Sequence, residues 1–245
     1  MKSRQGTDTP ISGAVDTVKT KVIEHPFSFR ASTDAELNKL IVAAVNHMGG
    51  TGEGAEDAYQ QSLRALRGRA EDAVKVVVAE YAALPEDQYL DRWSLVELLS
   101  ALRHRSALDA LGRIVASEIP PERSKDPHSF STAGEEVMIR TTAVDALGRL
   151  RAAGVAEAGR LLLRGAEHSN FSVRRASVQA IMESGSPDEQ KALRELLDRR
   201  QETRLLEIKR RDVREVPQAI GGRFVVNQDR KNEAPPPELK GRDPI

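Results

Sequence analysis

The chain has 245 residues, and its 37 Lys and Arg balance 37 Asp and Glu, so no overall field draws it to nucleic acid or to an anionic membrane. It contains no cysteine, which excludes disulfides, thiolate catalysis and cysteine-ligated metal centres. No apolar run is long enough for a signal-peptide core or a membrane span, so the sequence predicts a cytoplasmic protein without a membrane segment.

The first 54 residues precede the regular part of the chain. Residues 1–30 carry apolar residues at helical spacing until Pro26 ends the pattern, and we interpret them as an N-terminal tail or a capping segment. Residues 31–54 are predicted to form an N-terminal helix followed by a glycine-rich linker. The letters GTGEGA at 50–55 match a dinucleotide fingerprint, but that motif needs a strand before the loop, and here a helical pattern precedes it. We therefore expect a linker.

Four short apolar segments then recur at intervals typical of a helical repeat. They read LRAL at 63–66, VELL at 96–99, VDAL at 144–147 and VQAI at 178–181. Counted between first residues, the spacings are 33 (63 to 96), 48 (96 to 144) and 34 (144 to 178). Each is followed by a second apolar pattern in the same register. A unit of two helices cannot bury its apolar face alone, so such units stack into an α-solenoid.

The repeat predicts an all-α fold, a right-handed α-solenoid of about four antiparallel helix pairs over residues 55–199. The expected pairs are 55–67 with 69–83, 86–103 with 105–117, 134–152 with 155–166, and 170–184 with 187–199. The longest interval arises because residues 118–133 form an inserted loop between the second and third pairs. Such an insertion emerges on one face of a solenoid, often the binding face.

Two of these segments carry a family resemblance. Residues 137–150 (VMIRTTAVDALGRL) and 172–181 (SVRRASVQAI) place an apolar residue before an arginine, then small residues, then Val or Ala and a further apolar residue. In this they resemble the first helix of HEAT repeats of the short bacterial kind. Arg92 and its neighbours fit the pattern in part, and Tyr59 departs from it.

The resemblance covers residues 55–199 and has implications for architecture and function. It implies an outer layer of first helices and an inner, concave layer of second helices. It implies no reaction, because most relatives are binding scaffolds, and only a minority act on DNA, carry lyase activity or regulate an enzyme partner.

The helical pattern continues beyond residue 199 with a positive charge. Residues 199–214 contain seven basic and three acidic side chains, with apolar residues between them. We expect a charged C-terminal helix over 200–216 that either caps the last repeat or docks on a partner. Within the remainder, GGRFVV at 221–226 is typical of a short strand or clip. Residues 217–245 are predicted to be a flexible, proline-rich tail.

The candidate partner-binding residues are cations. Arg160 and Arg194 occupy equivalent positions in second helices, 34 residues apart, with Arg113 and Arg164 nearby. A row of guanidinium groups would clamp carboxylates or phosphates. The alternative is an exposed face on which these arginines pair with neighbouring acids, namely Asp109, Glu157 and Glu195. The charged C-terminal segment adds Arg204, Lys209, Arg210 and Arg211.

Catalytic and metal chemistry have little support in the sequence. There is no P-loop and no nucleophile elbow, and the five histidines lack the spacing of metal ligands. Glu122, Asp126 and His128 of the inserted loop could converge on a cation, although loops of this composition are usually solvated. His104 and His168 are expected at helix ends, where an imidazole meets free carbonyls.

Two further features have structural interpretations. Trp93, the only tryptophan, is interpreted as a ring packed between repeats rather than as a recognition platform. Glu135 and Glu136 lie near the start of a predicted helix, where acids favour the helix dipole.

Three hypotheses of function follow. The first is a protein–protein interaction scaffold or adaptor, non-enzymatic and without a cofactor, that holds another protein through the concave layer, the inserted loop and the tails. The second is duplex nucleic-acid binding by the second-helix arginines and the basic segment, against which the zero net charge counts. The third is an accessory or lyase-type protein acting on a small ligand or cofactor, which requires an apolar concavity with convergent polar groups.

Overall fold

Helices dominate the part of the chain that the structure, a computed structural model, describes: residues 34–48, 50, 54–125, 130–208, 219–220 and 223–224. The α-helices are α1 (Ala35–His47), α2 (Ala55–Arg67), α3 (Ala70–Ala83), α4 (Tyr89–Leu102), α5 (Leu108–Ala116), α6 (Thr132–Ala152), α7 (Ala156–Gly165), α8 (Phe171–Ser184) and α9 (Pro187–Arg199). Two 3₁₀ turns, η1 (Arg105–Ala107) and η2 (Thr203–Leu206), accompany α5 and α9. The predicted segment 1–30 lies outside the described residues.

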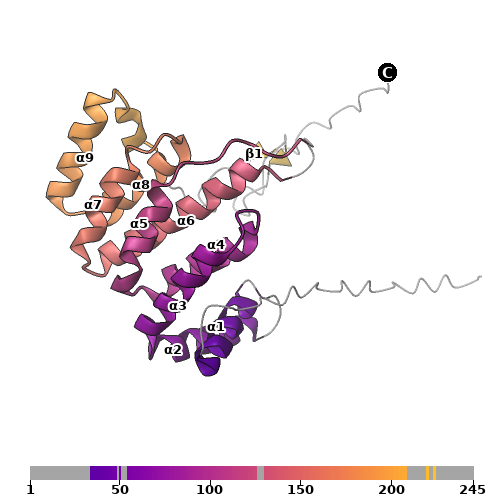
Figure 1. The fold of residues 1–245 in the computed structure, drawn as a ribbon. Helices are drawn as coiled ribbons and strands as arrows, with labels where there is room; N and C mark the ends of the chain where they lie inside the picture. The colour runs from indigo at the N-terminus through magenta and orange to yellow at the C-terminus, as the bar shows by residue number, and fades with distance from the viewer. Residues whose placement is uncertain are drawn as a thin grey trace, which may run out of the picture.

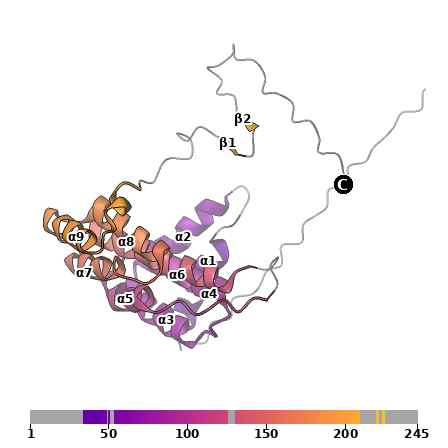
Figure 2. The same ribbon diagram turned by 90° about the horizontal axis from the view of Figure 1, so that it is seen from above.

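The helices stack in two parallel rows. Figure 2 shows the second helices of each pair, α3, α5, α7 and α9, along one row, and α4, α6 and α8 along the other. Helix α6 packs against both α4 and α8, while α7 lies between α5 and α9 (Figure 1). The predicted all-α solenoid of helix pairs is therefore confirmed.

The N-terminal end of the solenoid is closed by α1. Asp34 caps this helix by accepting hydrogen bonds from the backbone N–H groups of Glu36 and Leu37 (3.1 and 3.0 Å), which have no partner inside the helix. The apolar stripe of α1 is buried, mainly against α2. Asp34 also accepts from Arg69 at the start of α3 (2.6 Å), which fixes α1 to the first pair. Between α1 and α2, Gly54 adopts φ +81°. Residues 49 and 51–53 of the predicted glycine-rich linker lie outside the described residues.

One continuous apolar core runs between the rows. Its largest fully buried side chains include Leu63, Leu98, Leu99, Ile139, Leu147 and Leu162, drawn from successive units. Each such leucine contributes about 1.5–3 kcal/mol through its transfer out of water. Small residues let the helices approach, because a Cβ on Gly112 of α5 would lie only 2.9 Å from the side chain of Leu161 on α7. Successive units therefore share one apolar core, as stacking requires.

Equivalent arginines in the first helices hold the linkers between units. Arg92 donates to the carbonyl of Glu86 (2.8 Å), and Arg140 donates to those of Ser117 and Glu118 (2.8 and 2.5 Å). Arg174 donates in the same way to His168 and Ser169 (2.9 and 2.7 Å). Each guanidinium satisfies carbonyls that no helix bonds, which is the role of the arginine in the repeated pattern.

The last pair begins with a strong helix start. Ser186 and Glu189 form a reciprocal capping box around Pro187, which occupies the first turn. Glu189 also accepts from Arg151 near the end of α6 (2.9 Å). These bonds fix the turn between α8 and α9 against the preceding unit.

The charged helix predicted over 200–216 is not continuous with α9, which is a correction. Helix α9 ends at Arg199, Gln201 adopts φ +57°, and the next regular element is the single turn η2. Leu205 is buried and Gln179 of α8 donates to the carbonyl of Ile208 (3.0 Å), so this segment caps the last repeat. The remaining residues 209–216 lie outside the described part.

A short antiparallel pair follows, and its second strand lies within the GGRFVV segment, for which the sequence predicted a short strand or clip. Strand β1 (Ala219–Ile220) pairs with β2 (Arg223–Phe224), with Ala219 opposite Phe224 and Ile220 opposite Arg223. The other residues of 217–245 are outside the described chain.

Candidate binding surface

The arginines predicted for the second helices are all exposed. Arg113 lies on α5, Arg160 and Arg164 lie one turn apart on α7, and Arg194 lies on α9. Because these helices form one row, the structure brings the four cations to the same helix layer (Figure 2).

Within the described residues, none of these four arginines has an acidic partner within 4.0 Å. The acid expected to pair with them on α7, Glu157, lies instead 3.6 Å from Arg105 in η1. Asp109 and Glu195 form no ion pair with them in that part of the chain. These four side chains are therefore exposed, and their guanidinium groups have no hydrogen-bond or ion-pair partner among the described residues.

The cations predicted after α9 separate into two groups. Arg204 is exposed within η2, beside the buried Leu205 of the cap. Lys209, Arg210 and Arg211 lie outside the described residues.

A cavity of about 280 Å³ lies where α3, α4 and α5 meet. Its walls are mainly apolar, and its polar groups are Tyr81, Arg92, Arg113 and Ser117. The apolar lining residues are Val78, Ala82, Leu99, Ala110 and Ile114. Arg113 thus belongs both to the exposed row and to the wall of a cavity.

The Tyr81 hydroxyl in this cavity is held by Arg92. The Arg92 guanidinium donates to the hydroxyl oxygen (3.1 Å) and lies 5.4 Å from the centre of the Tyr81 ring. Because that oxygen is the acceptor, its own proton is available for another acceptor, and the structure gives it none among the described residues.

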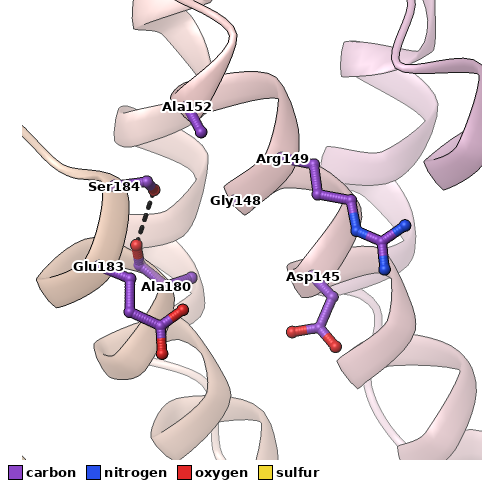
Figure 3. A pocket seen from close by; sticks show the side chains of 7 residues that line it. All are labelled: Asp145, Gly148, Arg149, Ala152, Ala180, Glu183 and Ser184. Atoms are coloured by element: carbon purple, nitrogen blue, oxygen red, sulfur yellow. Dashed lines mark hydrogen bonds between the residues drawn. The ribbon is translucent and has the colours of Figure 1, made fainter.

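A second hollow, of about 270 Å³, is lined by residues of α6 and α8, which pack against each other in the other row (Figure 3). Gly148, Ala152 and Ala180 form small-residue walls, and Asp145, Arg149, Glu183 and Ser184 supply its polar groups. The Ser184 hydroxyl donates to the Ala180 carbonyl (2.7 Å), so it is satisfied within its own helix. Arg149 lies 4.0 Å from Glu97, where burial raises the pKa of Glu97 although the arginine opposes the shift.

The described part of the inserted loop folds back on α6. The Glu122 carboxylate accepts from the hydroxyls of Ser131 and Thr132 (2.5 and 2.6 Å) and from the backbone N–H of Thr132 (3.0 Å). These bonds hold the pKa of Glu122 well below its usual range. Glu122 therefore caps a helix start, while Asp126 and His128 lie outside the described residues.

Glu136 has a role that its sequence position did not indicate. It is buried between two arginines, accepting from Arg92 (2.5 Å) and from Arg140 one turn later in α6. Burial alone would raise the pKa of Glu136, but the bonds from Arg92 and Arg140 outweigh it and lower that pKa. Its interpretation as an acid favouring the dipole is corrected, since α6 begins at Thr132 and Glu136 lies beyond the first residues of the helix. The four-residue spacing between Glu136 and Arg140 places both side chains on one helix face, and this spacing could have indicated their ion pair from the sequence.

Two other predicted side chains have structural roles. The Trp93 indole donates to the Thr142 hydroxyl across the α4–α6 contact (3.1 Å), which agrees with a ring packed between repeats. His168 Nδ1 accepts from the N–H of Asn170 (2.9 Å), so Nε2 carries the proton and donates to the Ser117 carbonyl (3.2 Å), as expected. His104 differs, because its ring accepts from the Ser106 N–H and caps η1.

The described residues offer no metal site, since no three His, Asp or Glu side chains gather where they could hold an ion. In the same residues, no helix combines the length and the apolar character needed to cross a membrane.

The geometry defines a class of protein, an α-solenoid of paired helices whose linkers are held by first-helix arginines. Residues 132–208 match the family model of HEAT repeats. This match covers the third and fourth helix pairs and the cap behind them, the part of the chain that includes both segments on which the resemblance rests. No curated protein and no solved structure matches the chain.

Proposed function

We propose that this protein is a non-enzymatic interaction scaffold that binds another protein through the row of second helices. The observation that carries the proposal is the set of four exposed arginines on α5, α7 and α9, which have free donors while first-helix arginines are used by the fold. HEAT repeats are generally protein-interaction scaffolds. A surface cation without a partner contributes little to folding, so these side chains are available for binding.

The charge of this surface favours an acidic protein over duplex nucleic acid. Asp109, Glu195 and Asp198 are exposed on the same helices as the arginines, and the whole chain carries no net charge. A duplex presents a uniform line of phosphates and would meet these carboxylates as well. A protein partner can place its acids opposite the arginines alone.

The inserted loop adds an apolar contact to this proposal. Phe130, at the end of the loop, is 86% exposed, which is unusual for a large aromatic side chain. We infer that a partner covers it, because a large aromatic side chain contributes most to binding when it is fully desolvated inside an interface.

The test is affinity capture from host lysate with matched variants of the full chain. The charge-reversed variant R160E/R164E/R194E should lose a stoichiometric protein partner that the wild type retains, with capture reduced at least tenfold. The control R175E reverses an exposed arginine on α8, in the other row, and should retain the partner. Equal capture by both variants would refute the assignment of the second-helix row. Salt-sensitive recovery of nucleic acid instead of protein would refute the scaffold.

A further inference from the structure

We infer that the cavity between α3, α4 and α5 is a recognition pocket for a carboxylate attached to an aliphatic group. The inference rests on the proposed function, because it states the chemistry that a partner presents to one point of the second-helix row. The natural ligand is thus a segment of a partner protein that carries an acid beside an apolar side chain.

The charge of the lining selects an anion. Of the nine residues that line the cavity, two are arginines and none is acidic. Glu136 neutralises Arg92 through a bond of 2.5 Å, and Arg92 also donates to the Tyr81 hydroxyl, so the charge of Arg92 is compensated within the fold. Arg113 has no acidic partner within 4.0 Å among the described residues, and its guanidinium supplies the uncompensated charge.

The hydrogen-bond donors select a carboxylate in particular. Arg113 offers the planar pair of N–H groups that matches two carboxylate oxygens. The Tyr81 hydroxyl accepts from Arg92 and has its own proton left to donate. Tyr81 of α3 and Arg113 of α5, two side chains with donors to offer, thus line one cavity, and in the proposed complex the ligand carboxylate accepts from both.

The walls select the rest of the ligand. Val78 and Ala82 from α3 and Ala110 and Ile114 from α5 line the cavity, with Leu99 of α4 between them. An aliphatic group of the ligand gains about 25 cal/mol for each Å² of apolar surface removed from water. The volume of about 280 Å³ lies just below the range of small-molecule pockets, about 300–1,000 Å³, which suits one or two side chains.

The hollow between α6 and α8 lacks the acid-free, cationic lining of the cavity between α3, α4 and α5. Its lining includes two acids, Asp145 and Glu183, and one arginine, Arg149, which lies within 4.0 Å of Glu97 (Figure 3). It therefore repels a carboxylate and serves as an internal comparison.

The test uses small probes on the full chain, observed by NMR of arginine Nε–H groups and of Val, Leu and Ile methyl groups. N-acetyl-leucine presents a chain-end carboxylate beside an aliphatic side chain, and N-acetyl-aspartate amide presents a side-chain carboxylate. N-acetyl-leucinamide has the aliphatic group without the charge. Because the probes are not proteins, this result is independent of whether lysate capture succeeds.

We expect saturable shifts at Arg113 and Ile114 with at least one of the two carboxylates, and none at Arg164. Whichever carboxylate binds more tightly identifies the source as a chain end or a side chain. The variant R113Q should weaken that probe at least tenfold, which corresponds to one charged hydrogen bond, and A82F should abolish binding by filling the cavity. Circular dichroism would establish that both variants fold.

Three results would overturn the pocket. These are the absence of saturable shifts at Arg113 with either carboxylate, equal affinity for N-acetyl-leucinamide, or unchanged affinity in R113Q. Loss of binding in R113Q together with unchanged protein capture would leave the scaffold intact and place the pocket outside its interface.

Discussion

Replacement of Glu136 by glutamine tests how the first-helix arginines stabilise the solenoid. The carboxylate accepts from Arg92 and Arg140, and its side chain is only 5% exposed. Glutamine has the same shape but no charge, so both guanidinium groups lose their counter-charge inside the protein. Removing one member of a buried ion pair costs about 3–5 kcal/mol. For a chain of this size, we expect a fall in melting temperature on the order of 10 °C.

The assay is equilibrium unfolding in urea followed by circular dichroism, with a matched substitution at the surface. In E71Q the same chemical change breaks a pair with Lys75 in which both side chains are 63% exposed. Water already screens that pair, so E71Q should unfold together with the wild type. The slope of the free energy against urea should be equal in all three proteins, because the surface buried on folding is the same.

The pH dependence gives an independent check of the cause. The pKa of Glu136 in the folded protein lies below its ordinary value of 4.5. A lowered folded pKa gives stability that is complete above the unfolded pKa and is lost as pH falls through the folded one. The difference in unfolding free energy between wild type and E136Q should therefore be complete at pH 6 and should shrink below about pH 4.5. The ion-pair argument would be refuted if E136Q lost as little unfolding free energy as E71Q. It would also be refuted if the loss in E136Q stayed constant down to pH 3.

Three further substitutions test other contacts. Gly165→Ala presses a methyl group against Ser177 between α7 and α8, and urea unfolding should show a loss of about 1–3 kcal/mol. Leu205→Ala removes the apolar side chain that closes the last repeat; it should cost about 2–5 kcal/mol and speed amide exchange in α8 and α9 but not in α4. Trp93→Phe removes the bond to Thr142 and should cost about 1 kcal/mol in thermal unfolding, and a later Thr142→Val should then add little.

The helices could be predicted from the sequence because apolar residues recur at helical spacing and local signals mark several of the helix ends. Ser186, Pro187 and Glu189 mark the start of α9, and the structure forms the capping box that these residues allow. The predicted and observed bounds of α2 are the same, residues 55–67, since an acidic first turn and a basic last turn flank its apolar stripe. These signals are local, so a single chain suffices to read them.

The path of the charged segment after α9 could not be predicted because tertiary burial competes there with the local helical pattern. Its apolar residues fit a helix, but Gln201 turns the chain at φ +57° so that Leu205 reaches the exposed end of the core. The bonds from Arg174 to Glu202 (3.1 Å) and from Gln179 to Ile208 hold this path against α8. Tertiary burial therefore overrides the helical pattern.

The candidate site was only partly predictable, because chemistry at a site depends on neighbours that spacing does not reveal. The sequence identified Arg113 as a candidate but gave no sign that Tyr81, 32 residues earlier, lines the same cavity. It also gave Arg92 a place in the family pattern without its partner Glu136, 44 residues later. Both relations join different units, and they exist only after the units stack.

The two rows of arginines show how one residue type serves stability and binding in the same repeat. Arg140 is 3% exposed and has carbonyl and carboxylate acceptors, so its donors are used by the fold. Arg160, on the following helix, is exposed and has no acidic partner among the described residues. Substitutions of the buried first-helix arginines should therefore lower the free energy of unfolding. Substitutions of the exposed second-helix arginines should weaken binding and leave stability unchanged. Arg92 joins the two rows, since it holds Glu136 on one side and Tyr81 of the cavity on the other. A change at Arg92 is thus expected to affect both properties together, and its two effects can be separated only by comparison with E136Q and R113Q.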